Sequence, residues 1–454
     1  MPACQALRPQ FAPGPTGPGR QDRRDAGALR PATGLAPAQP QLAGVTVARA
    51  RGCWVEDAAG RAFLDLTSGV ATLNLGHGHP GVIAAARAQM EDLVHSGGAF
   101  AHAPAHELAA CLARVAPPGL DAVLLATTGS EANELALRIA RHATGRSGVV
   151  SFRGGFHGRT AGALACTTGR AAFRSGVLPG GVAVAPFPRP GAWGMGAERA
   201  AEVALAGLDE LHRHELPPEE TACYLVEPVQ GQGGCHPAGR RFLEGLRERA
   251  DRVGALLVFD EVQTGMGRTG EWFAAQAFGV TPDLMTLAKA LGAGFPLSAV
   301  VGRPALVGGL PMALHGSTFG GSPLACAAAV AGMRAMRADD LLARARALAV
   351  RATDAVADLP LVCPQVAEVR GAGLMIGIEL ADTGTRAPRP DLAAAACVAA
   401  HDAGVLVLRS GPESEVIRIL PPLTIAEAEL DHGLEVLREA VLAACADAPA
   451  SLAA

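Results

Sequence analysis

The stretch Leu256-Leu-Val-Phe-Asp-Glu-Val-Gln263 decides the fold class of this 454-residue chain. Leu256–Phe259 is an unbroken apolar run of strand length, and the carboxylate of Asp260 follows it at once. Runs without polar alternation are typical of parallel strands covered by helices on both faces. A carboxylate at the mouth of such a strand is costly unless a cationic group neutralises it. The stretch therefore predicts a buried parallel strand that ends at a functional site.

Three further apolar runs of similar length occur upstream, at Val123–Ala126, Val149–Phe152 and Cys223–Val226. Amphipathic helical patterns, at 132–142 and 238–253 among others, lie between the runs. This alternation is typical of βαβ units in a doubly wound α/β domain. In such sheets ligands bind beyond the carboxyl ends of the strands, so the residues after each run are candidate site residues.

Glycine-rich and polar segments do follow the runs. They are Thr127-Thr-Gly-Ser-Glu-Ala-Asn-Glu134, Gly154-Gly-Phe-His-Gly-Arg-Thr160, Glu227-Pro-Val-Gln-Gly-Gln-Gly-Gly234 and Asp260-Glu-Val-Gln263. In the first segment, Gly129 and Ser130 open a helix whose free N–H groups suit a phosphate, although Ser130 could also be an ordinary N-cap. In the second, Phe156 offers an aromatic face and Arg159 a cation.

Lys289 is the only lysine in the sequence, beside 38 arginines. Either side chain serves as a solvated cation, but only lysine loses its proton near neutral pH and attacks a carbonyl as a free amine. Lys289 ends the strand-like segment 282–289 among apolar residues, where desolvation would lower its pKa. We interpret it as a Schiff-base lysine; the alternative is a leftover surface lysine.

Composition argues against several function classes. The net charge of −4 and the pI near 6.4 give no reason to expect nucleic acid or an anionic membrane as a partner. No apolar run approaches the roughly 20 residues of a membrane span. The ten scattered cysteines favour reduced thiols in a cytoplasmic protein over disulfides. His77 and His79 lack a third ligand in view, so an ordinary loop is favoured over a metal site.

Seven motifs, in order between about residues 45 and 440, resemble the class III pyridoxal-phosphate-dependent aminotransferases. They are Thr128-Gly-Ser-Glu-Ala-Asn-Glu134, Phe156-His-Gly-Arg-Thr160, Glu227-Pro-Val-Gln-Gly231, Asp260-Glu-Val-Gln-Thr-Gly-Met-Gly-Arg-Thr-Gly270, Leu287-Ala-Lys-Ala290, Gly316-Ser-Thr-Phe-Gly-Gly-Ser-Pro-Leu-Ala-Cys326 and Val416-Ile-Arg-Ile-Leu-Pro-Pro-Leu-Thr-Ile425. Residues 404–425 are most similar to the 4-aminobutyrate aminotransferases. The segment 315–321 is more similar to the acetylornithine and ornithine branch.

The resemblance implies a fold type I transferase, with a large domain around a mostly parallel, doubly wound sheet and a smaller α+β domain built from both chain ends. We expect a disordered tail at 1–40, the first part of the small domain at 41–95, the large domain that binds pyridoxal phosphate at 96–324, and the rest of the small domain at 325–446. A chain of this length exceeds the roughly 250–300 residues of a single core. Within the last part, the pattern predicts one strand over 405–408.

The resemblance also implies the roles of individual residues toward pyridoxal phosphate. Lys289 would form the Schiff base, and Asp260 would keep the pyridine nitrogen protonated. The remaining cofactor contacts would be Gly129 and Ser130 at the phosphate, Phe156 stacked on the ring, Val262 beneath it, Gln263 at the ring hydroxyl, Glu227, and Thr318. Because Thr318 would reach the phosphate of the neighbouring subunit, the resemblance implies a homodimer. It implies no metal.

Substrate contacts implied by the resemblance are Val70, Arg159, Gln232 and Arg418. The two arginines match the carboxylate-binding arginines of the family, and a bidentate guanidinium suits dicarboxylates such as glutamate and 2-oxoglutarate. Gln232 departs from the family, where a glutamate pairs with the C-terminal arginine and masks its charge when an ω-amine substrate is bound. The neutral amide weakens the case for a strict ω-amino donor.

The expected function is transfer of an amino group, by a ping-pong mechanism, between an amino acid or a 4-aminobutyrate-like ω-amine and 2-oxoglutarate. Acetylornithine, ornithine or diaminobutyrate as the amino donor is the first alternative. A pyridoxal-phosphate-dependent decarboxylase or epimerase on the same scaffold is the second. A non-enzymatic α/β binding protein is the third, and it predicts no Schiff base that borohydride could reduce.

Overall fold

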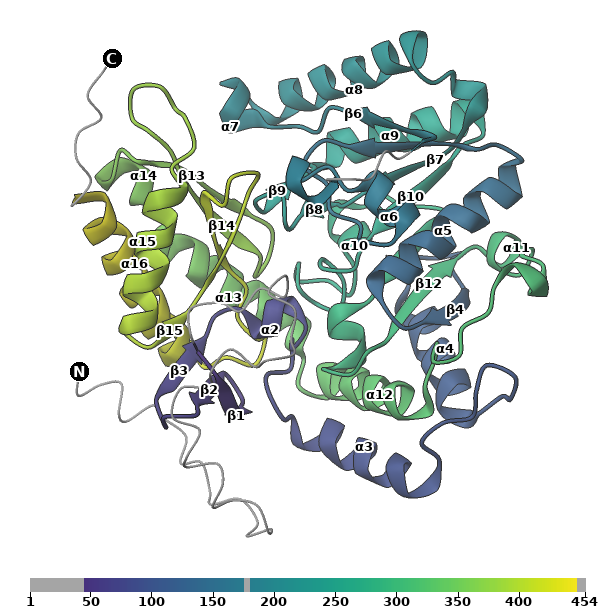
Figure 1. The fold of residues 1–454 in the computed structure, drawn as a ribbon, viewed down its shortest axis with the longest axis horizontal. Helices are drawn as coiled ribbons and strands as arrows, with labels where there is room; N and C mark the ends of the chain where they lie inside the picture. Colours follow the sequence, from purple (N-terminus) through teal and green to yellow (C-terminus); the bar gives the residue numbers. More distant parts are fainter. Residues whose placement is uncertain (1–44, 175–179, 447–454) are drawn as a thin grey trace.

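The computed structural model describes residues 45–174 and 180–446. The tail expected at 1–40 lies outside the described residues. Figure 1 shows a large part built around a central sheet, beside a smaller part to which both the first and the last described elements belong.

A seven-stranded sheet forms the centre of the large part, in the order β4-β12-β11-β10-β7-β5-β6 among the described residues. Its strands are β4 (Ala122–Ala126), β5 (Gly148–Phe152), β6 (Val182–Ala185), β7 (Thr221–Val226), β10 (Leu256–Asp260), β11 (Leu284–Leu287) and β12 (Ser298–Gly302). All neighbouring pairs are parallel except those of β12, which runs antiparallel to β11 and β4. The chain turns back directly after β11, without a crossover helix, and this reverses β12.

Helices cover both faces of the sheet, which explains the unbroken apolar runs. Along β7, Cys223 and Leu225 pack into a cluster with α5 (Gly129–Thr144), while Tyr224 and Val226 pack on the opposite face with α8 (Ala197–His214) and α9 (Arg240–Val253). Alternate residues of a strand point to opposite faces, so a doubly covered strand is apolar at every position. The predicted doubly wound α/β architecture is confirmed.

The smaller part contains two sheets. In the first, β1 (Val47–Arg51), β2 (Trp54–Asp57) and β3 (Ala62–Asp65) form the expected antiparallel meander, and β15 (Val405–Leu406) joins β3 in parallel. The second has the order β13-β14-β17-β16, with β13 (Val366–Gly371), β14 (Ile376–Leu380), β16 (Leu408–Ser410) and β17 (Val416–Ile419). The single strand predicted over 405–408 is wrong, because the chain passes there from one sheet to the other.

The remaining elements pack around these sheets. They are α2 (Ser68–Ala71), α3 (Pro80–Asp92), α4 (Ala103–Val115), α6 (Ala161–Cys166), α7 (Pro190–Trp193), α10 (Ala274–Phe278), α11 (Pro304–Val307), α12 (Pro323–Ala338), α13 (Leu341–Val356), α14 (Leu359–Val362), α15 (Pro390–Asp402) and α16 (Glu427–Ala446), the short pair β8 (Val229–Gln230) and β9 (His236–Pro237), and the 3-10 turns η2 (Ala171–Arg174), η3 (Pro218–Glu220), η4 (Lys289–Gly292) and η5 (Met312–Leu314). Helix α12 packs against α3 and α4 below the sheet in Figure 1.

The short element α2 is a turn of left-handed backbone conformation and not a right-handed α-helical turn. Ser68, Val70 and Ala71 have φ of 45°, 66° and 61°, a conformation that is unfavourable for a β-branched residue such as Val70. The fully buried Arg268 donates from Nη2 to Ser68 Oγ at 3.1 Å and from Nη1 to the Leu374 carbonyl at 3.0 Å. Arg268 thereby ties this strained turn to the C-terminal part of the chain.

Candidate active site

A cavity of about 520 Å³ lies at the carboxyl ends of the central strands. The residues predicted from the sequence that line it are Val70, Gly129, Ser130, Phe156, Glu227, Gln232, Asp260, Val262, Gln263, Lys289 and Arg418. They come from widely separated positions in the chain and from both parts of the molecule. The fold therefore brings together most of the residues that the sequence marked.

Lys289 lies at the first position of η4, directly after β11 and Ala288. Its φ of 42° is left-handed, so the backbone holds it in a conformation that a non-glycine residue rarely adopts. Burial lowers the pKa of Lys289 to about 8, with a further contribution from the positive charge of Arg418. Near neutral pH, a useful fraction of this amine is therefore free to attack a carbonyl.

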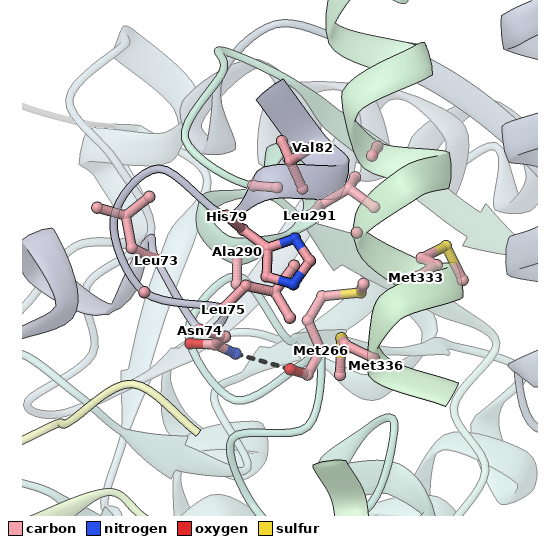
Figure 2. Close-up of a pocket in the computed structure, with 14 residues that line it drawn as sticks. Leu73, Asn74, Leu75, His79, Val82, Met266, Ala290, Leu291, Met333 and Met336 are labelled. Atoms are coloured by element: carbon pink, nitrogen blue, oxygen red, sulfur yellow. Dashed lines mark hydrogen bonds between the residues drawn. The ribbon is translucent and has the colours of Figure 1, made fainter. Parts of the chain in front are cut away.

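A second, much smaller hollow is lined by Ala290 and Leu291, the residues that directly follow Lys289 in η4 (Figure 2). Its volume of about 10 Å³ has room for little more than one water molecule. Met266, Leu291 and Met333 surround the His79 ring there, and Asn74 donates to the Met266 carbonyl at 2.6 Å. The hollow is too small for a cofactor, and its apolar packing supports the turn that carries Lys289.

Asp260 ends β10 and is buried in a network of hydrogen bonds. Its Oδ2 accepts from His157 Nδ1 and from Asn133 Nδ2, each at 2.8 Å. Its Oδ1 accepts from the backbone N–H of Val262 at 3.0 Å. Every one of these groups donates a hydrogen bond to the carboxylate. Asp260 therefore presents a firmly oriented carboxylate to the cavity.

Three polar residues of this network are not among the site residues expected from the sequence. Asn133 and His157 line the cavity, and Thr286 on β11 donates from Oγ1 to Asn133 Oδ1 at 2.8 Å. Thr286 thus fixes the orientation of the Asn133 amide, whose Nδ2 then points at Asp260. One feature of the sequence does point to Asn133 and His157 as site residues: both fall inside glycine-containing motifs that follow strands.

The N-terminus of α5 opens on the cavity at Gly129 and Ser130. Thr128, not Ser130, is the N-cap: its side chain accepts from Glu131 N, and Glu131 in turn accepts from Thr128 N, which completes a capping box. A Cβ at Gly158 would lie 2.3 Å from Ser130 Oγ, so only glycine allows this close approach. The backbone N–H groups of Gly129 and Ser130 are left to bind an anion.

Glu227 and Gln263 form one wall of the cavity. Glu227 accepts from the backbone N–H groups of Phe156 and Gly231, at 2.8 and 3.0 Å. Burial raises the pKa of Glu227 to about 7, against the positive charge of His157. Gln263 is buried, and its Nε2 has no hydrogen-bond partner in the part of the chain that the structure describes. A buried donor without a partner indicates a missing acceptor at this wall.

Arg418 on β17 reaches the cavity from the smaller part of the molecule. The side chain is buried, and burial lowers the pKa of Arg418. Within residues 45–174 and 180–446, Arg418 forms no ion pair and its Nε has no partner. Gln232 lines the same cavity but brings no negative charge. The guanidinium is thus available for a carboxylate.

Two predicted residues, Arg159 and Thr318, do not line the cavity. The guanidinium of Arg159 lies over the ring of Phe173, at 5.2 Å, and at 6.0 Å from the ring of Phe156. Its backbone N–H donates to Ser130 Oγ at 3.1 Å, so the residue adjoins the anion site without facing the cavity. Thr318 is exposed on the segment between η5 and α12.

The described residues contain no cluster of three or more His, Cys, Asp or Glu side chains arranged to hold a metal ion. His77 Nε2 donates to Asp65 Oδ2 at 2.8 Å, while His79 lies in the small hollow of Figure 2. In the same ranges, no helix is both long enough and apolar enough to cross a bilayer.

The cavity fits pyridoxal phosphate. It offers a free amine at Lys289, an anion site at the N-terminus of α5, a carboxylate at Asp260 for a pyridinium nitrogen, and an unpartnered amide at Gln263 for the ring hydroxyl. Phe156 and Val262, which also line the cavity, provide apolar surface for a flat ring. These groups match the functional groups of the cofactor one for one.

Comparisons with known proteins agree with this chemistry. The family description Aminotransferase class-III matches residues 35–441. The 5-aminovalerate aminotransferase DavT of Pseudomonas putida is 38% identical over 403 residues, which cover 88% of this chain and 94% of DavT. The 4-aminobutyrate aminotransferase GabT of Escherichia coli is 39% identical over 396 residues, covering 86% and 92%. The crystal structure of taurine:2-oxoglutarate aminotransferase from Bifidobacterium kashiwanohense, in complex with PLP and glutamate, superimposes with a TM-score of 0.85 at 27% identity and covers 91% of this chain and 96% of that chain.

Proposed function

The chain belongs to the class III aminotransferases, and from this premise we propose that it transfers an amino group between a 4-aminobutyrate-like ω-amino acid and 2-oxoglutarate. It is a pyridoxal-phosphate-dependent transaminase. The observation that carries the proposal is that the side chains of Lys289, Asp260 and Arg418 line one cavity. A free amine, an anion for a pyridinium and a carboxylate-binding cation are the three groups that the reaction needs.

When bound, pyridoxal phosphate supplies an aldehyde that condenses with amines and a ring that withdraws electrons from the substrate Cα. Lys289 would hold the aldehyde carbon between turnovers. An incoming substrate amine would release Lys289 from this carbon. The free Lys289 amine would then move the proton at the amine-bearing carbon of the substrate, because its pKa of about 8 lets it both accept and donate a proton near neutral pH. Asp260 would hold a proton on the ring nitrogen, and the N-terminus of α5 would bind the phosphate.

Substrate carboxylates would be bound by Arg418 and, after a side-chain rearrangement, by Arg159. Val70, held by the strained turn, would contact the aliphatic part of the substrate at the opposite wall. Gln232 stands where the family has a glutamate, so the charge of Arg418 stays unmasked. This observation favours α-amino dicarboxylates as good donors beside ω-amines, which is the second candidate specificity.

We also propose a homodimer in which Thr318 contacts the phosphate bound by the neighbouring subunit. The segment around Thr318 exposes large apolar side chains: Met312 is 95% exposed, Phe319 61% and Leu314 40%. Phe319 packs against the ring of His95, with ring centroids 5.0 Å apart. An apolar surface of this kind indicates a protein contact.

Subunit mixing tests the shared site. A hybrid of a Thr318→Asp subunit and a Lys289→Arg subunit would contain one site with an intact lysine and an intact threonine. Each variant alone is expected to be inactive, and the mixture is expected to regain activity. A mixture that stays inactive although the two subunits associate would refute the shared site.

The donor is tested by a spectrophotometric half-reaction screen with 4-aminobutyrate, 5-aminovalerate, β-alanine, ornithine, N-acetylornithine, 2,4-diaminobutyrate and α-amino acids. Conversion to pyridoxamine phosphate with an ω-amino acid, and return with 2-oxoglutarate, is the expected result. Release of carbon dioxide or racemisation without an oxo acid product would favour a decarboxylase or an epimerase instead. We place the reaction in the cytoplasm, because the nine cysteines of the described residues are all free thiols.

A further inference from the structure

A second cavity, of about 450 Å³, lies between the ends of β5 and β6 and the loop that follows β16. Its lining and that of the active-site cavity have no residue in common. Three arginines, Arg153, Arg170 and Arg189, line it together with the aromatic rings of Phe187 and Trp193. The cavity thus combines concentrated positive charge with flat apolar surface.

The charge of Arg189 is not neutralised by its hydrogen-bond partners. Arg189 Nη1 lies 2.8 Å from His236 Nε2, and since a guanidinium only donates, that imidazole nitrogen must accept. His236 is therefore neutral, in line with the burial and the neighbouring charge of Arg370 that lower its pKa. The other contact of Arg189, at 3.5 Å, is to the amide oxygen of Gln230.

Three acidic side chains lie near this cavity, and one of them, Glu415, acts through its charge on Arg170 and Arg189 without forming an ion pair with either in the described residues. Glu368 and Glu379 both form ion pairs with Arg370, the first at 2.9 Å. Among the described residues, none of the three lining arginines forms an ion pair with a carboxylate, and Arg170 donates only to the Gly411 carbonyl, at 2.7 and 3.0 Å. Guanidinium groups that have no direct ion-pair partner and line a concave site favour binding of an oxyanion.

We propose that this cavity is a second ligand site, which binds the carboxylate or phosphate of a small molecule with an aromatic or similarly flat apolar body. The oxyanion would contact Arg153 and Arg189, and the body would lie against Phe187 and Trp193. The ligand would also adjoin the active site, because Gly411 donates its N–H to the Gln232 carbonyl at 3.0 Å while its own carbonyl binds Arg170.

Isothermal titration calorimetry of the cofactor-loaded enzyme tests the site with phenyl phosphate, phenylacetate and inorganic phosphate. Binding is detected as heat, so the outcome does not depend on whether the proposed transamination is correct. The stronger of the first two probes identifies the head group. The double variant Arg153→Gln/Arg189→Gln is expected to bind that probe at least about tenfold more weakly, since each lost charge-assisted hydrogen bond contributes about that factor.

Three further variants complete the design. Arg241→Gln, an exposed arginine on α9, is the matched control and should leave the affinity unchanged. Trp193→Ala should weaken the two phenyl probes and leave inorganic phosphate unaffected. Arg418→Gln should retain the binding event. Wild-type enzyme that binds neither phenyl probe, equal affinity of the double variant, or a binding event lost only in Arg418→Gln would each overturn the proposal. Melting temperature and cofactor absorbance report whether the variants are folded.

Discussion

Oδ2 of Asp260 lies 2.8 Å from Nδ1 of His157, and both side chains are buried. Burial alone would lower the pKa of His157, but the hydrogen bond and the negative charge of Asp260 raise it. The imidazole therefore presents its Nδ1 proton to the carboxylate. A carboxylate oriented in this way can stabilise a proton on a basic ring nitrogen in the cavity.

Replacing Asp260 with asparagine is expected to lower the rate of the half-reaction by about 10²- to 10⁴-fold, because the amide cannot stabilise a protonated ring nitrogen. Stopped-flow absorbance with a good amino donor measures this rate. Asp283→Asn is the matched control: Asp283 is equally buried but pairs with Arg247 at the other end of β11. If the half-reaction rate falls by the same factor in both variants, the loss in Asp260→Asn is caused by general destabilisation of the protein.

Lys289→Arg keeps the positive charge but removes the only ε-amine of the sequence. Covalent attachment of the cofactor should be lost, because a guanidinium stays protonated and does not condense with an aldehyde. Mass spectrometry after borohydride reduction should show the added mass on the wild-type chain and not on the variant. Normal turnover by the variant would refute the assigned role of Lys289.

Gly158→Ala is expected to weaken cofactor binding about tenfold or more. Its Cβ would lie 2.3 Å from Ser130 Oγ, and its φ of 129° is unfavourable for alanine, so the anion site at the start of α5 must shift. Equilibrium titration of the apoenzyme with pyridoxal phosphate measures the change. Gly145→Ala, with φ of 68° and open space around its Cβ, carries backbone strain alone and should leave cofactor affinity unchanged.

Gln232→Glu is expected to raise the ratio of kcat/KM for 4-aminobutyrate to that for glutamate by about tenfold. A carboxylate at this wall can pair with Arg418, which has no ion pair in the described residues, and mask its charge. The two substrates are measured on the same preparation, so a change in folding or cofactor content cancels in the ratio. An unchanged ratio would contradict the assignment of Gln232 to specificity.

Lys289→Met should stabilise the apoenzyme at pH 7 by on the order of 3 kcal/mol, because the pKa of Lys289 is about 8 in the folded state against 10.5 for an ordinary lysine. Below pH 8 the folded wild type bears the full cost of a buried charge. Between pH 8 and 10.5 the folded state has released this proton while the unfolded state retains it, so wild-type stability rises relative to the variant. Urea unfolding at pH 7, 8.5 and 10 should show that the difference in free energy of unfolding between the variant and the wild type decreases as the pH rises. A difference that does not change with pH would contradict the lowered pKa of Lys289.

The sequence predicted most of the central strands, though not β6, and most of the cavity lining, because both follow from local patterns. Buried strands are predicted from unbroken apolar runs, and the ends of neighbouring parallel strands lie at one edge, so Glu227 after β7 and Asp260 at the end of β10 are expected to lie near one another. Lys289 was identified by composition, since an isolated lysine among arginines needs a chemical reason.

Other features depend on contacts that no local pattern encodes. The apolar run of β12 is the same for either strand direction, so its antiparallel orientation follows only from the short turn after Lys289. In the sequence Thr286 has the features of an ordinary strand residue, and its role depends on the tertiary contact by which α5 places Asn133 opposite it. The guanidinium of Arg159 is drawn over the ring of Phe173, which lies outside the motif that contains Arg159.

The pairing of β3 with β15 has a consequence for biosynthesis. Leu64 is aligned with Val405 in parallel register. About 340 further residues must therefore be translated before the partner strand of β3 leaves the ribosome, and until then this edge of the N-terminal meander is unpaired. Arg418 emerges later still. A nascent chain can thus complete the central sheet and the Lys289 turn early, yet it gains a carboxylate-binding pocket only when nearly the whole chain has left the ribosome. We expect the exposed edge of β3 to be the segment that molecular chaperones protect during this interval.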